Sequence, residues 1–170
     1  MKTQRERKLE IVLLKEKLER ISNKKVLFKE KEDILVPRNL DTRDEKYKQK
    51  ILKLLQQKIH DGDLDLSDLP LPFELKDLGN LERVNGHLDL RTAPIKDLGN
   101  LERVNRWLYV HNTPITSLGN LEYVGDDLNL YNTPIKDLGN LKVVKGTLWI
   151  SKEQEGKIKG LEKFNYKFWA

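Results

Sequence analysis

The chain has 170 residues, of which 38% are hydrophobic and 35% are charged, and its formal net charge is +5. It contains no cysteine, which excludes disulfides, thiolate metal sites and a cysteine nucleophile, and favours a reducing, cytoplasmic location. No apolar run approaches the ~20 residues that span a bilayer, so we expect a soluble protein without a membrane partner.

The N-terminal part of the chain, over positions 1–60, is basic, with 18 Lys and Arg against 10 Asp and Glu, and it carries helical patterns. Apolar residues three and four apart predict an amphipathic helix over 5–22 and a second helix over 43–60. The apolar face of the second helix would bury Tyr47, Ile51, Leu54, Leu55 and Ile59. We therefore expect residues 1–61 to form an N-terminal helical cap, with nucleic-acid binding as the alternative use of its basic surface.

Four 20-residue segments then align without gaps over 78–157, after a degenerate opening turn at 62–77. They read "LGNLERVNGHLDLRTAPIKD", "LGNLERVNRWLYVHNTPITS", "LGNLEYVGDDLNLYNTPIKD" and "LGNLKVVKGTLWISKEQEGK". About six apolar positions per repeat cannot close a core alone, but they can when successive coils stack. An L-x-L triplet in each repeat predicts a strand, and Pro and Gly mark the turns. The pattern predicts stacked parallel strands without outer helices.

The segment "LNLYNTPI" (128–135) resembles the leucine-rich-repeat pattern L-x-L-x-x-N-x-L, with Thr133 where Asn is usual. The four-residue spacing from Val104 to Leu108 is similar to the receptor L-domain style of these repeats, which also occurs in bacterial, phage and giant-virus proteins. The resemblance covers about 62–151. It implies an α+β protein, a short-period leucine-rich-repeat solenoid of stacked parallel strands. It also implies a binding module whose strand face is the recognition surface.

A solenoid also needs a cap at its far end, because an open end exposes core and unpaired strand edges. Residues 152–170 are expected to form this C-terminal cap. The apolar side chains expected to cover the last coil are Ile158, Leu161, Phe164, Phe168 and Trp169. We interpret the aromatic tail as part of the cap rather than as a ligand-binding element.

Residue patterns for catalysis or metal binding are weak. The chain has three histidines, at positions 60, 87 and 111, without an obvious metal-ligand spacing, and it lacks phosphate-loop and nucleophile-elbow motifs. The acidic run at 61–68 starts like a calcium loop, but Leu66 and Pro72 stand where Gly and Glu are needed. We therefore predict no catalytic residue, no metal site and no cofactor.

The residues before, between and after the leucines of each triplet must face outward, in three columns along the stack. The columns are His87, Trp107, Asp127 and Thr147; Asp89, Tyr109, Asn129 and Trp149; and Arg91, His111, Tyr131 and Ser151. The opening turn adds Asp63, Asp65 and Ser67. Trp, Tyr and Arg are common interface anchors. We predict a partner-binding surface made of Trp107, Tyr109, His111, Tyr131, Trp149, Arg91, Asp89, Asn129, His87 and Asp127. The alternative is that aromatic cross-strand pairs merely stiffen the sheet.

These patterns together predict a non-enzymatic protein–protein interaction module that binds a peptide or loop epitope of a partner protein. The repeat style and the lysine-rich, cysteine-free composition favour a phage or bacterial inhibitor or adaptor of a host protein, acting in the cytoplasm. Alternatives are nucleic-acid binding through the basic N-terminal helices, a virion or assembly component, and glycan binding on the aromatic face. The partner's identity and the oligomeric state are left open.

Overall fold

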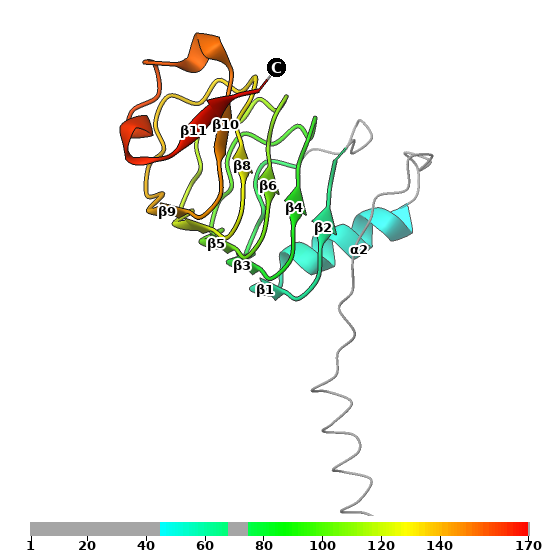
Figure 1. Ribbon diagram of the computed structural model, residues 1–170. Helices are drawn as coiled ribbons and strands as arrows, with labels where there is room; N and C mark the ends of the chain where they lie inside the picture. The colour runs from blue at the N-terminus through cyan, green and yellow to red at the C-terminus, as the bar shows by residue number, and fades with distance from the viewer. Residues whose placement is uncertain (1–44, 68–74, 170) are drawn as a thin grey trace, which may run out of the picture. The chain divides into compact units, whose positions relative to one another are not determined.

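A computed structural model describes residues 45–67 and 75–169, and the structural statements below concern these residues. They form a β-solenoid of about five turns in which successive coils stack side by side (Figure 1). The helix predicted over 5–22 lies outside the described residues. No helix in the described ranges is long and apolar enough to cross a membrane.

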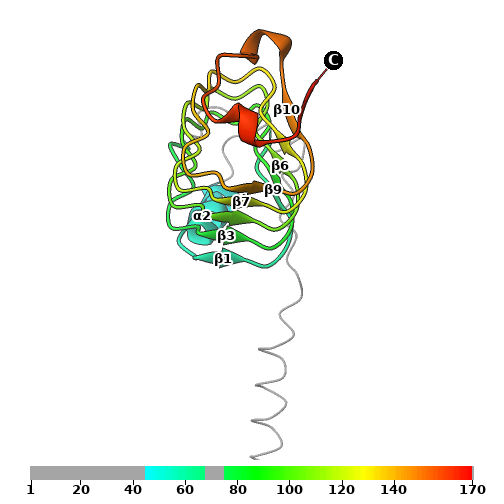
Figure 2. The same cartoon turned by 60° about the vertical axis from the view of Figure 1, so that its left-hand side comes forward.

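Each complete coil contributes one short strand to each of two parallel sheets, which form different sides of the coil (Figure 2). Sheet A runs in the order β11-β10-β8-β6-β4-β2 and sheet B in the order β1-β3-β5-β7-β9. The strands of sheet A are β2 (Leu64–Asp65), β4 (Leu88–Asp89), β6 (Leu108–Tyr109), β8 (Leu128–Asn129), β10 (Leu148–Ile150) and β11 (Tyr166–Phe168). Those of sheet B are β1 (Ile59–His60), β3 (Arg83–Val84), β5 (Arg103–Val104), β7 (Tyr123–Val124) and β9 (Val143–Val144).

The strand register follows the sequence repeat. Leu108 lies opposite Leu88 and Leu128, each one 20-residue repeat away, whereas Leu64 pairs with Leu88 because the first coil is longer than a repeat. This confirms the strands expected at the L-x-L triplets and the stacking of each repeat on the next. Sheet B is an addition that the sequence pattern does not predict.

The repeated apolar positions form one core along the whole stack. The core encloses the first leucine of the triplet in each repeat and the Val of the sheet B strands β3, β5 and β7. The side chains with 0% exposure include Leu88, Leu108, Leu128, Leu148, Val84, Val104 and Val124. Burying one such side chain stabilises the fold by roughly 1.5–3 kcal/mol, so the inward columns account for the fold.

Two kinds of corner turn the chain in each coil. Gly99 and its three counterparts in the other repeats have φ between +55° and +61°, where glycine is unstrained. The Gly99 N–H donates to Asp97 Oδ1 at 2.6 Å. The corner after sheet A also has positive φ, at Thr92 (+58°), Asn112 (+58°) and Asn132 (+53°). Asn tolerates this conformation, whereas it strains a β-branched residue such as Thr92.

The helix α2 (Glu45–Leu55) lies beside the first coils (Figure 1). Ile51, Leu54 and Leu55 are buried in the core as expected, but the helix ends at Leu55 and not at residue 60. Ile59 fits the helical spacing, yet it pairs with Arg83 as part of β1 and is 47% exposed. The prediction of a helix to residue 60 that buries Ile59 is therefore wrong, because strand pairing replaces the last helical turn.

The chain after β10 forms two short 3-10 helices, η1 (Lys152–Gln154) and η2 (Leu161–Lys163), followed by β11. Ile158 and Leu161 are buried against the last coil, as predicted. Phe168 and Trp169 are 43% and 42% exposed, so they bury less apolar surface on the last coil than predicted. The reason is that β11 pairs with β10 and extends sheet A.

Candidate functional site on the outer face of sheet A

The outward side of sheet A carries an unbroken series of ring contacts. The ring centroids of Trp107 lie 4.7 Å from His87 and 5.9 Å from Tyr109, and Tyr109 lies 6.1 Å from His111. The series continues from His111 to Trp169 at 6.1 Å and from Trp169 to Trp149 at 5.4 Å. We call these six rings the aromatic strip: His87, Trp107, Tyr109, His111, Trp169 and Trp149. Aromatic pairs at such distances are worth about 0.5–1.5 kcal/mol each beyond their burial.

The strip is unevenly exposed. Trp107 and Trp169 are both 42% exposed, whereas the other four rings are half-buried. Two indole rings of the strip are therefore accessible from solvent, while Tyr109 and His111, which lie between them in the series, are less exposed. Tyr131 is half-buried in the same outward column as His111 and is not part of the strip.

The first outward column links one coil to the next through side-chain acceptors. Asp63 Oδ1 accepts the His87 N–H at 2.7 Å, His87 Nδ1 accepts the Trp107 N–H at 3.2 Å, and Asp127 Oδ1 accepts the Thr147 N–H at 2.7 Å. Asp127 Oδ2 also accepts from Trp149 Nε1 at 3.1 Å. His87 and Asp127 thus have structural roles on the predicted surface. Trp107 occupies the corresponding position in its own coil, and its indole side chain cannot accept such a hydrogen bond.

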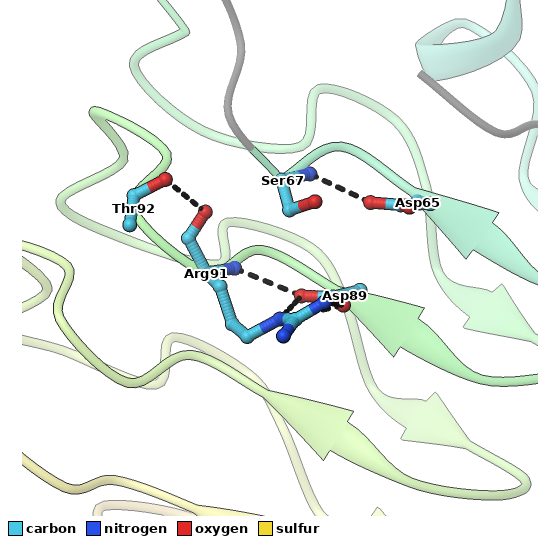
Figure 3. Close-up of polar contacts among 5 residues, drawn as sticks. All are labelled: Asp65, Ser67, Asp89, Arg91 and Thr92. Carbon is cyan, nitrogen blue, oxygen red and sulfur yellow. Dashed lines mark hydrogen bonds and ion pairs between the residues drawn. The ribbon is translucent and has the colours of Figure 1, made fainter. Parts of the chain in front are cut away.

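The second outward column uses its short polar residues to close the turn that follows each strand (Figure 3). Asp65 Oδ1 accepts the Ser67 N–H at 2.9 Å, and Asp89 Oδ1 accepts the Arg91 N–H at 3.0 Å. The Arg91 guanidinium folds back onto Asp89, with Nη2 2.6 Å from Oδ2. The Arg91–Asp89 pair lies directly beside the strip, because the guanidinium carbon is 6.0 Å from the Tyr109 ring centroid.

Asn129 follows the same turn pattern but is fully buried, which corrects its assignment to the accessible surface. Its Oδ1 accepts the Tyr131 N–H at 2.9 Å, while its Nδ2 has no hydrogen-bond partner within the described residues. Its neighbours across the sheet are the large side chains of Tyr109 and Trp149, which accounts for its burial. His111 Nδ1 is likewise buried and unpartnered in this part of the chain. Ser67 and Ser151, also expected to face outward, are only 8% exposed.

The electrostatic environment keeps the centre of the strip uncharged. Burial, followed by the positive charge of Arg91, lowers the pKa of His111 below its usual 6.5, so the ring is neutral at pH 7. Burial, followed by the negative charges of Asp127 and Asp89, raises the pKa of the Tyr109 hydroxyl above its usual 10. Both rings therefore act as neutral hydrogen-bonding and packing groups.

Lys167 and Trp169 belong to this face, although the sequence pattern does not place them there. Lys167 lies opposite Trp149 in the strand register, and its Nζ is 5.9 Å from that ring centroid. Trp169 follows Phe168, which pairs with Ile150, so it occupies the next outward position, in the column of His111. The sequence signal for this placement is the alternation in "YKFW", which resembles "LWIS". It begins at Tyr166, before the position that one further 20-residue repeat after Leu148 would give.

No cluster of three or more His, Cys, Asp or Glu side chains that could hold a metal ion occurs among residues 45–67 and 75–169. No protein-family model matches this chain, and no curated protein or solved structure matches it either. The fold therefore defines the class: this is a parallel-strand β-solenoid with 20-residue turns.

Proposed function

We propose that the outer face of sheet A binds a partner protein and that the chain is a non-enzymatic interaction module. The observation that carries this proposal is the aromatic strip, in which Trp107 is 42% exposed and lies beside His87 and Tyr109 on one sheet. Exposed Trp and Tyr side chains in one continuous patch are the residues that most often dominate binding energy. The leucine-rich-repeat resemblance supports the same face, because the strand side is the recognition surface in that family.

The support beneath the strip favours binding with little loss of conformational freedom. The triplet leucines under it, such as Leu108 and Leu128, are 0% exposed, so the strands are held by the core. Trp107 is held between His87 and Tyr109, and Trp149 is held by its bond to Asp127. Side chains that are already ordered cost less entropy when a partner binds.

The charge on this face suggests a basic epitope. Its outward columns contain four carboxylates, of Asp63, Asp65, Asp89 and Asp127, against two cations, Arg91 and Lys167, although the whole chain has a net charge of +5. Complementary charge across an interface raises association rates and specificity. Six strands about 4.8 Å apart make a face about 24 Å long, which suits a peptide or a loop. We extend the proposal to a cytoplasmic inhibitor or adaptor of phage or bacterial origin on the basis of composition and repeat style.

The test is affinity capture from bacterial lysates, followed by affinity measurement with the captured protein. Trp107→Ala should weaken binding about tenfold or more, because an anchor in a partner pocket carries about 2 kcal/mol. Its melting temperature should fall by several degrees, because Trp107 loses its ring contacts with His87 and Tyr109, but the variant should stay folded because Trp107 lies outside the core. Lys136→Ala, at an exposed turn on another side of the coil, is the matched control and should bind as the wild type does.

The contrary outcome would be equal binding by Trp107→Ala, or a loss of binding confined to Lys136→Ala. A mobility shift with DNA or RNA would also contradict the proposal if it weakened by about one power of salt per phosphate contact. Binding through the aromatic strip should depend far less on salt.

A further inference from the structure

Residues 165–169, which we call the tail segment, add to the edge of sheet A as a peptide would. Their strand β11 runs parallel to β10, with Tyr166, Lys167 and Phe168 opposite Leu148, Trp149 and Ile150. The Leu148 N–H donates to Asn165 O and the Trp169 N–H donates to Ile150 O, both at 2.9 Å. The tail segment lacks the L-x-L triplet of the repeats, and it is held at the edge by main-chain pairing with β10 and by partial packing of Tyr166 against the core.

The tail segment also places two side chains on the candidate site. Lys167 Nζ lies 5.9 Å from the Trp149 ring centroid, and the Trp169 ring lies 6.1 Å from His111 and 5.4 Å from Trp149. A cation and an aromatic ring, two residues apart, thus lie against the acidic, aromatic face. This is the chemistry that such a face recognises, through cation–π attraction and ring packing.

The tail segment is less firmly packed than the strands beside it. Phe168 and Trp169 are 43% and 42% exposed, whereas Leu148 and Ile150 on the neighbouring β10 are both 0% exposed. Segments with little buried apolar surface open at lower free energy than the core. On the same face, the buried His111 Nδ1 and Asn129 Nδ2 have no hydrogen-bond partner within the described residues.

We propose that the tail segment is an internal occupant of the recognition site, in the place of a partner peptide. The partner it stands for is an extended segment of another protein that carries Lys or Arg and, two residues later, an aromatic residue. This partner segment pairs in parallel along β10 when the tail segment is displaced. The inference rests on the proposed function and adds the chemistry of the partner to it.

The experiment uses the full chain and a fluorescently labelled peptide with the sequence of residues 163–169, KFNYKFW. A tail variant, Lys167→Glu with Trp169→Ala, weakens the internal contacts without touching the core. It should bind the peptide about tenfold or more tightly than the wild type, because the wild-type tail competes for the same site. Peptides carrying either of the same two substitutions should bind the tail variant about tenfold less tightly. Glu162→Ala, at an exposed position before the tail segment, should behave as the wild type.

Amide hydrogen exchange of the wild type gives a second measurement that needs no variant. Opening of the tail segment alone would release the N–H groups of Leu148 and Trp169 together, while Leu108 stays protected by its bond to Asp127 O. We expect exchange at the first two sites about tenfold or more faster than at Leu108.

Two results would overturn the inference. One is that the folded tail variant and the wild type bind the peptide equally, or that neither of them binds it. The other is that the amides of Leu148, Trp169 and Leu108 exchange at one common rate. The proposed function can fail separately. If Trp107→Ala weakens binding of the captured protein while the peptide binds neither chain, the face is a recognition surface and the tail segment is only part of the scaffold.

Discussion

Replacing Asn129 by Asp tests whether the centre of the outer face of sheet A is closed to water. The substitution keeps the oxygen that accepts the Tyr131 N–H and replaces the unpartnered Nδ2 by a second carboxylate oxygen. Because Asn129 is 0% exposed, the new carboxylate would be buried, and Asp127, two residues earlier in the sequence, adds a like charge. Asp65 and Asp89 hold the same kind of turn, but both are half-buried rather than fully enclosed.

The magnitude follows from the protonation equilibrium. Burial raises the pKa of a carboxyl, and if it exceeds 7 the folded protein takes up a proton instead of burying a charge. Protonating a group whose unfolded pKa is about 3.9 costs about 4 kcal/mol at pH 7, at about 1.4 kcal/mol per unit. This sets the upper bound on the loss of stability. The loss should be absent below the unfolded pKa and grow as the pH rises towards the folded pKa.

Urea unfolding of Asn129→Asp and the wild type at several pH values between about 4 and 8 measures this loss directly. Asn120→Asp, at an exposed corner, is the isosteric control and should stay within about 0.5 kcal/mol of the wild type throughout. A variant as stable as the wild type at pH 7 would refute the reasoning, since it would mean that water or a protonated His111 compensates the charge.

Two further predictions concern the edge and the middle of the same face. Thr92→Asn should raise the free energy of unfolding by about 1 kcal/mol, because Thr92 holds φ +58°, which Asn112 adopts with less strain. Calorimetry measures this change. Unchanged stability would mean that the lost hydrogen bond from Thr92 Oγ1 to Arg91 O, at 2.7 Å, offsets the relief of strain. His111→Phe should flatten the fall in melting temperature between about pH 7.5 and 5.5. Since the folded-state pKa of His111 is lowered, its contribution is complete above about 6.5 and declines as the pH falls, and equal slopes would contradict this.

The part of the fold that could be predicted from the sequence is the part fixed within one repeat. Each L-x-L triplet has two buried positions around one variable position, so the alternation is visible in a single strand. A strand of sheet B buries one residue only, as at Val84 beside the exposed Arg83, and a two-residue strand with one apolar position has no recognisable period.

The features that were missed depend on partners far away in the sequence. Ile59 joins a strand because Arg83, from the next coil, lies beside it. Asn129 is buried because its neighbours on the adjacent coils are Tyr109 and Trp149, each a full repeat away in the sequence. Trp169 reaches the face only because β10 offers an open edge. Local propensity contains none of this information. The repeat alone therefore predicts which residues align in a column, but it does not predict how exposed each of them is.

The outward columns also explain which of their residues the fold does not require. In the first two columns Asp63, His87 and Asp127 accept an N–H from the following coil, and Asp65, Asp89 and Asn129 close the turn after their own strand. The side chains of Trp107, Tyr109 and Trp149 make neither of these two hydrogen bonds in the described part of the chain. The solenoid forgoes a local hydrogen bond at each of these three positions and has an aromatic ring there instead. Hydrogen bonding within the solenoid therefore does not require aromatic rings at these three positions, which is consistent with the role in binding that we propose.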